Sequence, residues 1–244
     1  MLKKLIAASL VAYLFAVLIA LLYSMSVLNP APLQAPDFAT IKDTAERKQA
    51  FFDFFRPIAD KRNQLILNRR EQLQALAASE PLSYRQQQQV YALAEHYHLD
   101  TDQPAEALIK PLLEHIDIVP TAMVLAQAAN ESSWGRSRFA EQGNNYFGQW
   151  CYRPGCGIVP SNRKAGARHE VQHFHSPVDS VNAYFRNINT HPAYQGLREL
   201  RAQMRERGEP LTAYQLVAGL GKYSERGDHY IDELRQMIRG NNLE

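Results

Sequence analysis

The chain has 244 residues, of which 45% are hydrophobic and 21% are charged, and its formal net charge is +2. This composition is typical of a globular protein of one or two domains with a sizeable core. The net charge is small and the lysines and arginines form no stripe with interleaved aromatic residues, so we expect no nucleic-acid partner.

The first 28 residues predict a membrane segment. Lys3 and Lys4 precede an uncharged apolar run over residues 5–23. At ~1.5 Å per residue, a helix of this length spans roughly 28 Å, which is enough to cross a bilayer. A signal peptide has a shorter apolar region and a small-residue cleavage site. The pattern therefore favours an uncleaved anchor over a cleaved signal, and either one places the rest of the chain outside the cytoplasm.

Residues 29–36 are rich in proline and predict a stiff linker. The region over residues 37–110 then predicts helices. Its apolar residues recur at helical spacing, at Phe51, Phe55, Ile58, Leu65, Leu73 and Leu76. Pro57 predicts a kink or a boundary between two helices. A capping box at residues 83–86 predicts the start of another helix.

Glu131 is the candidate general acid. A small apolar run begins after Pro120, a residue suited to the first turn of a helix, and ends at this glutamate. A carboxyl group there loses solvation and faces the negative end of the helix dipole, and both effects raise its pKa. A carboxylic acid that stays protonated near neutral pH can give its proton to a leaving group. The alternative is an ordinary exposed glutamate at a helix end.

Residues 148–176 are punctuated by glycine and proline and predict an irregular loop with a small β-hairpin. Within this segment, Cys151 and Cys156 flank a Pro-Gly turn. In an exported protein this spacing favours a disulfide over half of a metal site. Helical spacing returns over residues 176–190, 194–205, 211–220 and 228–238, so the predicted fold is mainly α.

The segment from His169 to His173 matches the zinc-protease pattern H-E-x-x-H. That chemistry requires a helix, because only a helix places both histidines on one face. Gly166 and Pro177 leave too little room for such a helix. We therefore expect these histidines on a strand, and we expect no metal site, no cofactor and no zinc protease.

Two segments carry a resemblance to a known family. Glu131-Ser-Ser-Trp-Gly-Arg-Ser and Asn144-Asn-Tyr-Phe-Gly resemble the motifs of glycoside hydrolase family 73, the endo-β-N-acetylglucosaminidases that include bacterial autolysins and the flagellar muralytic domain. Tyr146 stands where the family usually has leucine. The resemblance covers about residues 110–240. The N-terminal segment and the cysteine-bounded insertion are similar to those of Bax-type bacterial proteins.

The resemblance implies a lysozyme-like fold over residues 111–244, with a helical lobe facing a small β lobe. It also implies hydrolysis of β-1,4 bonds in peptidoglycan by a protein of the inner membrane that faces the periplasm. Glu131 takes the place of the general acid, Glu170 is the candidate base or electrostatic helper, and Tyr194 is the candidate for positioning substrate. The candidate substrate-binding residues are Trp134, Asn145, Tyr146, Phe147 and Tyr223.

Several alternatives remain open. A lytic transglycosylase also uses a glutamate followed by serine, as at Glu131 and Ser132, and it acts on the same polymer. A non-catalytic wall-binding or scaffold protein with the same fold belongs to another functional class. For each candidate aromatic residue, packing in the core is the alternative to contact with sugar.

Overall fold

The structure is a computed structural model that describes residues 32–79, 81–164 and 166–244. Residues Ala35–Glu244 form one compact unit, which is mainly helical and contains one small sheet. Within the described ranges, no helix is both long and apolar enough to span a bilayer. The predicted membrane segment, residues 1–28, lies outside the described residues, as does part of the predicted linker.

A single long helix, α2 (Thr44–Ala77), makes up much of the predicted helical region. The carboxylate of Asp43 caps it by accepting a hydrogen bond from the N–H of Glu46 at 2.8 Å. Pro57 lies inside α2, so the predicted boundary between two helices at this residue is wrong. Buried residues on both sides of the proline hold the helix together despite the loss of one backbone hydrogen bond.

The buried face of α2 differs in one position from the prediction. Phe51 and Phe55 are fully buried as expected, but Leu65 is 53% exposed. Ile66 is buried in its place. Eleven residues make just over three helical turns at about 3.6 residues per turn, so Ile66 lies on the face of Phe55 and Leu65 lies beside it.

Two shorter helices follow, α3 (Tyr84–His96) and α4 (Ala105–His115). The predicted capping box begins α3, where the backbone N–H of Ser83 donates to the side-chain oxygen of Gln86 at 2.8 Å. Pro111 lies within α4, which continues through it as one helix. Helix α4 packs against both α3 and α2.

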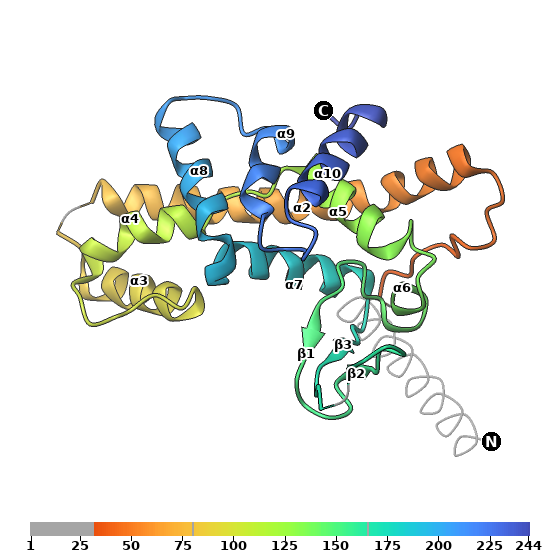
Figure 1. Cartoon of the computed structure of the whole chain (residues 1–244). Helices are drawn as coiled ribbons and strands as arrows, with labels where there is room; N and C mark the ends of the chain where they lie inside the picture. The colour runs from red at the N-terminus through yellow and green to blue at the C-terminus, as the bar shows by residue number, and fades with distance from the viewer. Residues whose placement is uncertain (1–31, 80, 165) are drawn as a thin grey trace, which may run out of the picture. The chain divides into compact units, whose positions relative to one another are not determined.

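The central helix α5 (Thr121–Ser132) carries the candidate acid near its C-terminal end. Most of its residues are buried, because it packs against α2 and α10 and also contacts α9 (Figure 1). Small alanine side chains let these helices approach closely. The apolar run in the sequence is therefore explained by burial on several sides.

A short helix and a small sheet follow, made of α6 (Arg138–Gly143), β1 (Trp150–Cys151), β2 (Gly157–Ile158) and β3 (Glu170–Gln172). The strands pair antiparallel in the order β1-β3-β2, with Trp150 opposite Val171 and Gly157 opposite Gln172. The predicted hairpin is confirmed as β2 and β3. Strand β1 was not predicted, because two residues are too few to show alternation.

The predicted C-terminal helices are confirmed. They are α7 (Pro177–Thr190), η1 (Pro192–Tyr194), α8 (Gln195–Glu206), α9 (Ala213–Leu216), η2 (Val217–Leu220) and α10 (Asp228–Gly240). In Figure 1, α7 runs between the small sheet and the other C-terminal helices. Helix α10 contacts α5, and α7 contacts α2.

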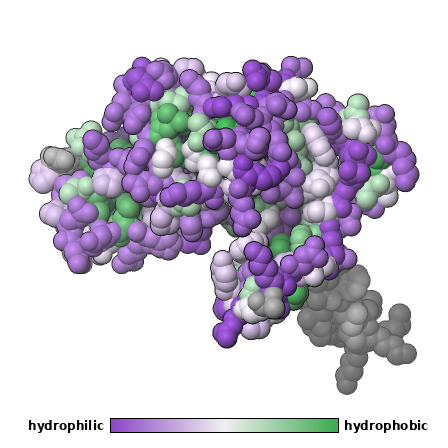
Figure 2. All heavy atoms as spheres, in the orientation of Figure 1, coloured by the Kyte–Doolittle hydropathy of each residue, from purple (hydrophilic) through white to green (hydrophobic). Residues whose placement is uncertain are grey.

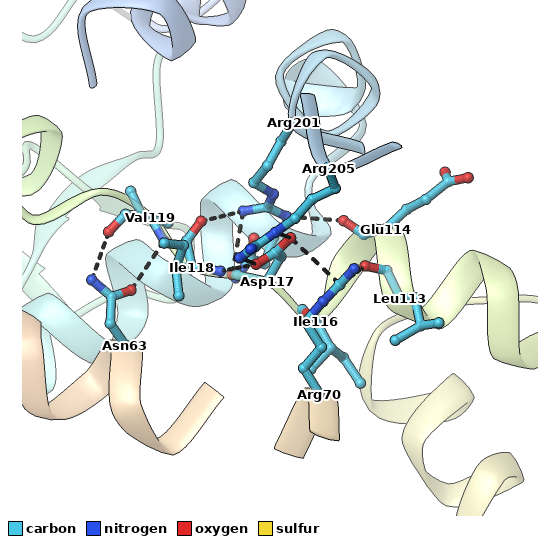
Figure 3. Close-up of polar contacts among 11 residues, drawn as sticks. Asn63, Arg70, Leu113, Glu114, Ile116, Asp117, Ile118, Val119, Arg201 and Arg205 are labelled. Atoms are coloured by element: carbon cyan, nitrogen blue, oxygen red, sulfur yellow. Dashed lines mark hydrogen bonds and ion pairs between the residues drawn. The ribbon is translucent and has the colours of Figure 1, made fainter. Parts of the chain in front are cut away.

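The connection between α4 and α5 is held by side chains from distant elements (Figure 3). Arg201 of α8 is fully buried and donates to two backbone carbonyls of this region at 2.7 and 2.9 Å. Asn63 of α2 pairs with Val119 by donating to its carbonyl at 2.8 Å and accepting from its N–H at 3.1 Å. These contacts fix the point at which α5 begins.

The charge at the same connection is balanced around Asp117, which is only 2% exposed (Figure 3). Arg205 donates two hydrogen bonds to its carboxylate at 3.0 and 2.8 Å, and Arg70 lies 3.4 Å away. Burial alone raises the pKa of Asp117, but the arginines outweigh burial and the pKa lies below its usual value. Burial lowers the pKa of Arg201 to about 10.

Candidate active site

Glu131 sits in the last turn of α5 and is half-buried. The chain then turns sharply, because Ser133, Trp134 and Gly135 take the left-handed conformation with φ of 52°, 60° and 77°. The hydroxyl of Ser132 holds this turn by donating to the carbonyl of Ala128 at 2.6 Å and accepting from the N–H of Gly135 at 2.9 Å. The serine after the acid therefore has a structural role here.

Glycine is required at position 135. A Cβ atom there would lie 2.3 Å from the ring of Phe38, in addition to the positive φ. Phe38 is buried and belongs to the segment that leads into α2. The turn that follows the acid is thus covered by the N-terminal part of the compact unit.

Burial of the Glu131 carboxyl raises its pKa above the ordinary glutamate value, which is the direction expected from the sequence. A hydrogen bond from Tyr230 and the charge of Arg226 oppose this rise without cancelling it. The Oε1 atom is buried and has no hydrogen-bond partner within the described residues. An oxygen in this state favours the protonated carboxylic acid.

A chain of hydrogen-bonded side chains leads to Tyr230, whose hydroxyl acts on the Glu131 carboxyl. Tyr184 of α7 donates its hydroxyl hydrogen to the side-chain oxygen of Gln127, and the Gln127 amide donates to the hydroxyl of Tyr230 at 2.9 Å. Gln127 and Tyr184 are fully buried. Burial raises the pKa of Tyr184 and of Tyr230, and the nearby charge of Glu131 adds to each rise. Both tyrosines therefore keep their protons near neutral pH.

The structure brings Tyr194 and Tyr223 to this cluster. The ring of Tyr223 stacks parallel to that of Tyr230 with centroids 5.6 Å apart, and Tyr194 lies 5.8 Å from Tyr223. Burial raises the pKa of Tyr194, and the charge of Glu131 adds to the rise. Tyr223 also donates to the carbonyl of Phe147 at 2.9 Å. Both tyrosines therefore lie close to Glu131.

The segment from Asn144 to Gly148 joins the small sheet to the helices. The Asn145 amide donates to the carbonyls of Gln149 and Gln172, each at 2.9 Å. Its oxygen accepts from the Gln149 N–H at 3.1 Å. Gly148 lies beside the acid, since a Cβ atom there would be 3.9 Å from Glu131 Oε2. The motif therefore places the backbone that leads into β1 next to the carboxyl.

Three of the predicted substrate-binding aromatic residues pack within the protein. Tyr146 is buried with its ring 4.6 Å from that of Phe55, and Phe147 stacks on Tyr184 at 4.2 Å. Trp134 lies 5.3 Å from the ring of Phe52. These contacts agree with core packing for Tyr146 and Phe147, whereas Trp134 is half-buried at the edge of the core.

Glu170, the candidate second catalytic group, begins β3. Its two carboxylate oxygens accept hydrogen bonds from the backbone N–H groups of Gly155 at 3.0 Å and Gly157 at 2.8 Å. These hydrogen bonds lower the pKa of Glu170, so it is ionised near neutral pH. Both oxygens therefore hold the loop between β1 and β2.

Asp179 is the other acidic residue near the small sheet in the sequence. It lies in the first turn of α7 and its carboxylate accepts a hydrogen bond from the Ser176 hydroxyl at 2.8 Å, so it stabilises the start of that helix.

Cys151 and Cys156 form the predicted disulfide. Their sulfur atoms and the Glu170 carboxylate lie within 4.8 Å of one another, but bonded sulfurs are not the thiolates that bind metals. Glu170 also belongs to a strand, so the H-E-x-x-H segment lacks the helix that a zinc site requires. His169 instead stacks on Trp150 with ring centroids 4.0 Å apart.

Neither Tyr184 nor Trp150 was predicted from the sequence to be a functional residue. Tyr184 comes from an amphipathic helix in which it is indistinguishable from any other core residue, and only the fold brings it to Gln127. The signal that could have pointed to Trp150 is its position, because this large aromatic residue stands two positions after the motif that ends at Gly148. It is 53% exposed in the structure.

A groove of about 930 Å³ lies elsewhere, between α2 and α3. Figure 2 shows apolar groups gathered at the end of the molecule where α3 lies. The groove is lined by residues that include Arg62, Leu65, Arg69, Leu93, His96 and Tyr97. Among the described residues that line it there is no carboxyl group, the usual proton donor in glycosidic cleavage.

Comparison with known proteins places the chain in a family. The family model described as mannosyl-glycoprotein endo-β-N-acetylglucosaminidase matches residues 106–243. The chain is 32% identical to the protein Bax of Escherichia coli (strain K12) over 207 residues. This alignment covers 84% of this chain and 74% of that protein. The solved catalytic domain of the autolysin Auto from Listeria monocytogenes is 17% identical with a TM-score of 0.44, covering 84% of this chain and 90% of that domain. The resemblance inferred from the motifs is thus confirmed, and the chain belongs to the glucosaminidase family.

Proposed function

We propose that the protein hydrolyses β-1,4 glycosidic bonds in peptidoglycan as an endo-β-N-acetylglucosaminidase, with Glu131 as the general acid. Membership of the glucosaminidase family supports a glycoside hydrolase. The state of the half-buried Glu131 carboxyl carries the assignment of the acid, because its pKa is raised and one of its oxygens has no hydrogen-bond partner among the described residues. The proposal includes a lysozyme-like arrangement, in which the helices with the acid face the small sheet.

In the proposed reaction the Glu131 carboxyl gives its proton to the glycosidic oxygen. The bond between that oxygen and the anomeric carbon breaks, and both electrons stay on the oxygen, which leaves as a hydroxyl. A water molecule then supplies the new hydroxyl at the anomeric carbon, and its proton restores the acid. The chain from Tyr184 through Gln127 fixes the hydroxyl of Tyr230, which acts on the carboxyl.

A second group must assist on the opposite face of the sugar. A carboxylate roughly 6.5–9.5 Å from the acid gives inversion, and one at about 5–5.5 Å gives retention. Glu170 is an ionised candidate for base or electrostatic helper, and its bonds to the loop keep it in one position. The acetamido group of the substrate is the other candidate. Tyr194 is proposed to orient the substrate, because it lies in the tyrosine cluster next to Glu131.

We also propose that the protein is held at the inner membrane by residues 5–23 and that its compact unit faces the periplasm. The apolar run supports the anchor. The disulfide supports an oxidising compartment. Fractionation of cells followed by protease treatment of spheroplasts tests this proposal. The proposal predicts that the full-length protein is found in the membrane fraction and is cut by protease only after the outer membrane is opened. A protein found in the cytosol contradicts the proposal.

Product analysis tests the type of reaction. Purified sacculi are digested with the wild-type protein and the released fragments are analysed by mass spectrometry. Reducing N-acetylglucosamine ends are expected. Anhydro-muramic ends would instead identify a lytic transglycosylase, and the absence of any released fragment would favour the wall-binding or scaffold alternative.

A further inference from the structure

Trp150 is an exposed aromatic residue that the function described above does not use. Its side chain is 53% exposed, although tryptophan is mostly buried on average. One face of the indole is covered, since it stacks on the imidazole of His169 at 4.0 Å with an angle of 17° between the rings. The exposed area therefore includes the opposite, flat face.

The backbone that carries this indole is fixed on both sides. Trp150 pairs with Val171 in the sheet, and the next residue, Cys151, is in the disulfide. The carbonyl of Gln149 accepts hydrogen bonds from the Gln172 N–H at 2.8 Å and from the Asn145 amide at 2.9 Å. A flat surface held in this way loses little conformational freedom when a ligand binds.

Trp150 is also close to the acid. Gly148 lies directly beside Glu131, since a Cβ atom at that glycine would be 3.9 Å from Glu131 Oε2. Two residues of chain span at most roughly 7 Å, so the backbone of Trp150 lies within about that distance of Gly148. This separation is comparable to that between neighbouring rings of a β-1,4-linked glycan.

We propose that the open face of Trp150 stacks on a hexosamine ring of the glycan strand next to the bond that is cleaved. This inference rests on the proposed function. Sugar rings present flat faces of C–H groups that pack well on an aromatic ring. His169 acts as a positioning residue that supports the covered face of Trp150.

The test uses the full-length protein with Glu131→Gln, so that a ligand binds without being cleaved. The probe is a soluble β-1,4-linked hexamer of N-acetylglucosamine, titrated by calorimetry. Trp150→Ala is expected to raise the dissociation constant about tenfold, and Trp150→Phe to raise it less. The matched control is Tyr152→Ala, because Tyr152 is 69% exposed in the neighbouring disulfide loop. An unchanged constant in Trp150→Ala, or an equal loss in Tyr152→Ala, overturns the inference.

A second measurement removes the concern that Trp150→Ala disturbs the sheet. The chain has two tryptophans, so Trp134→Phe leaves Trp150 as the only one. Its fluorescence is expected to change on addition of the hexamer, and no change overturns the inference. Failure of the proposed hydrolase function can be told apart from failure of the proposal for Trp150. If the wild type releases no fragments from sacculi but binds the hexamer through Trp150, the hydrolase proposal fails and the stacking on Trp150 stands. Equal kcat/KM on sacculi for wild type and Trp150→Ala overturns it while the hydrolase stands.

Discussion

At the scale of single residues, burial and a neighbouring hydroxyl act on the Glu131 carboxyl in opposite directions. Burial raises its pKa and the hydrogen bond from Tyr230 lowers it. A general acid works in its protonated form, so activity should fall as pH rises through the raised pKa of this group. The balance between the two effects therefore sets the upper pH limit of the reaction.

The variant Tyr230→Phe tests this balance. It removes the hydroxyl that lowers the pKa of Glu131, so that pKa should rise further and the alkaline limb of the pH profile of kcat/KM should move to higher pH. The profile is measured as turbidity loss of purified sacculi from pH 4 to 9. The control is Tyr84→Phe, because Tyr84 is exposed on α3. A limb that stays in place, or moves to lower pH, contradicts the account.

Local sequence was sufficient to propose Glu131 as the acid, because the apolar run and the polar turn both adjoin it in the chain. It was insufficient for the groups that support it. Tyr184 lies 57 residues from Gln127, and Tyr230 lies 103 residues from it. Each looks like an ordinary core position of an amphipathic helix, and only the packing of α7 and α10 against the centre reveals its contact.

At the scale of elements, the small sheet depends on contacts that its length alone does not provide. Strands of two or three residues form few ladder hydrogen bonds. The disulfide closes the loop between β1 and β2, and the Glu170 carboxylate holds the same loop through two backbone N–H groups. Glycine and proline predicted the loop and the hairpin, and the cysteine spacing predicted the disulfide. The anchoring by Glu170 has no local signal.

The pair of substitutions Cys151→Ser and Cys156→Ser should lower the free energy of unfolding by about 2 kcal/mol, as expected for opening a short loop. Urea denaturation of the compact unit in the full chain measures the loss. Glu170→Gln should also destabilise the protein, because an amide offers one acceptor oxygen where the carboxylate offers two. When combined, the substitutions should cost less than the sum of their separate effects, since both hold one loop. Additive losses would refute a shared role for Glu170 and the disulfide.

At the scale of the whole molecule, the helical region before the family motif and the C-terminal part form one compact unit. Helix periodicity predicted most of the helices that build it. The charged cluster of Arg70, Arg201 and Asp117 could not be predicted, because these residues are far apart in the sequence and resemble surface charges. In the fold they hold the N-terminal end of the helix that carries the acid (Figure 3).

The variant Asp117→Asn should lower the free energy of unfolding by about 3–5 kcal/mol near neutral pH, because it removes the buried counter-charge of Arg70, Arg205 and the fully buried Arg201. The folded-state pKa of Asp117 is lowered, so its contribution is present above the unfolded pKa and is lost as pH falls through the folded pKa. The difference from wild type should therefore shrink in acid. The control Arg207→Gln breaks an exposed pair with Glu209 and should change little. A small, pH-independent effect of Asp117→Asn would contradict this role.

The role of Glu131 is tested most directly by the rate at which Glu131→Gln digests purified sacculi, compared with wild type and with Glu141→Gln, which alters an exposed glutamate of α6. The variant should stay folded, because burial of the ionised Glu131 opposes folding as pH rises and the glutamine removes that effect. The account predicts that Glu131→Gln loses at least ~100-fold in rate while its melting temperature is not lowered and Glu141→Gln remains active. Release of fragments by Glu131→Gln at the wild-type rate would contradict it.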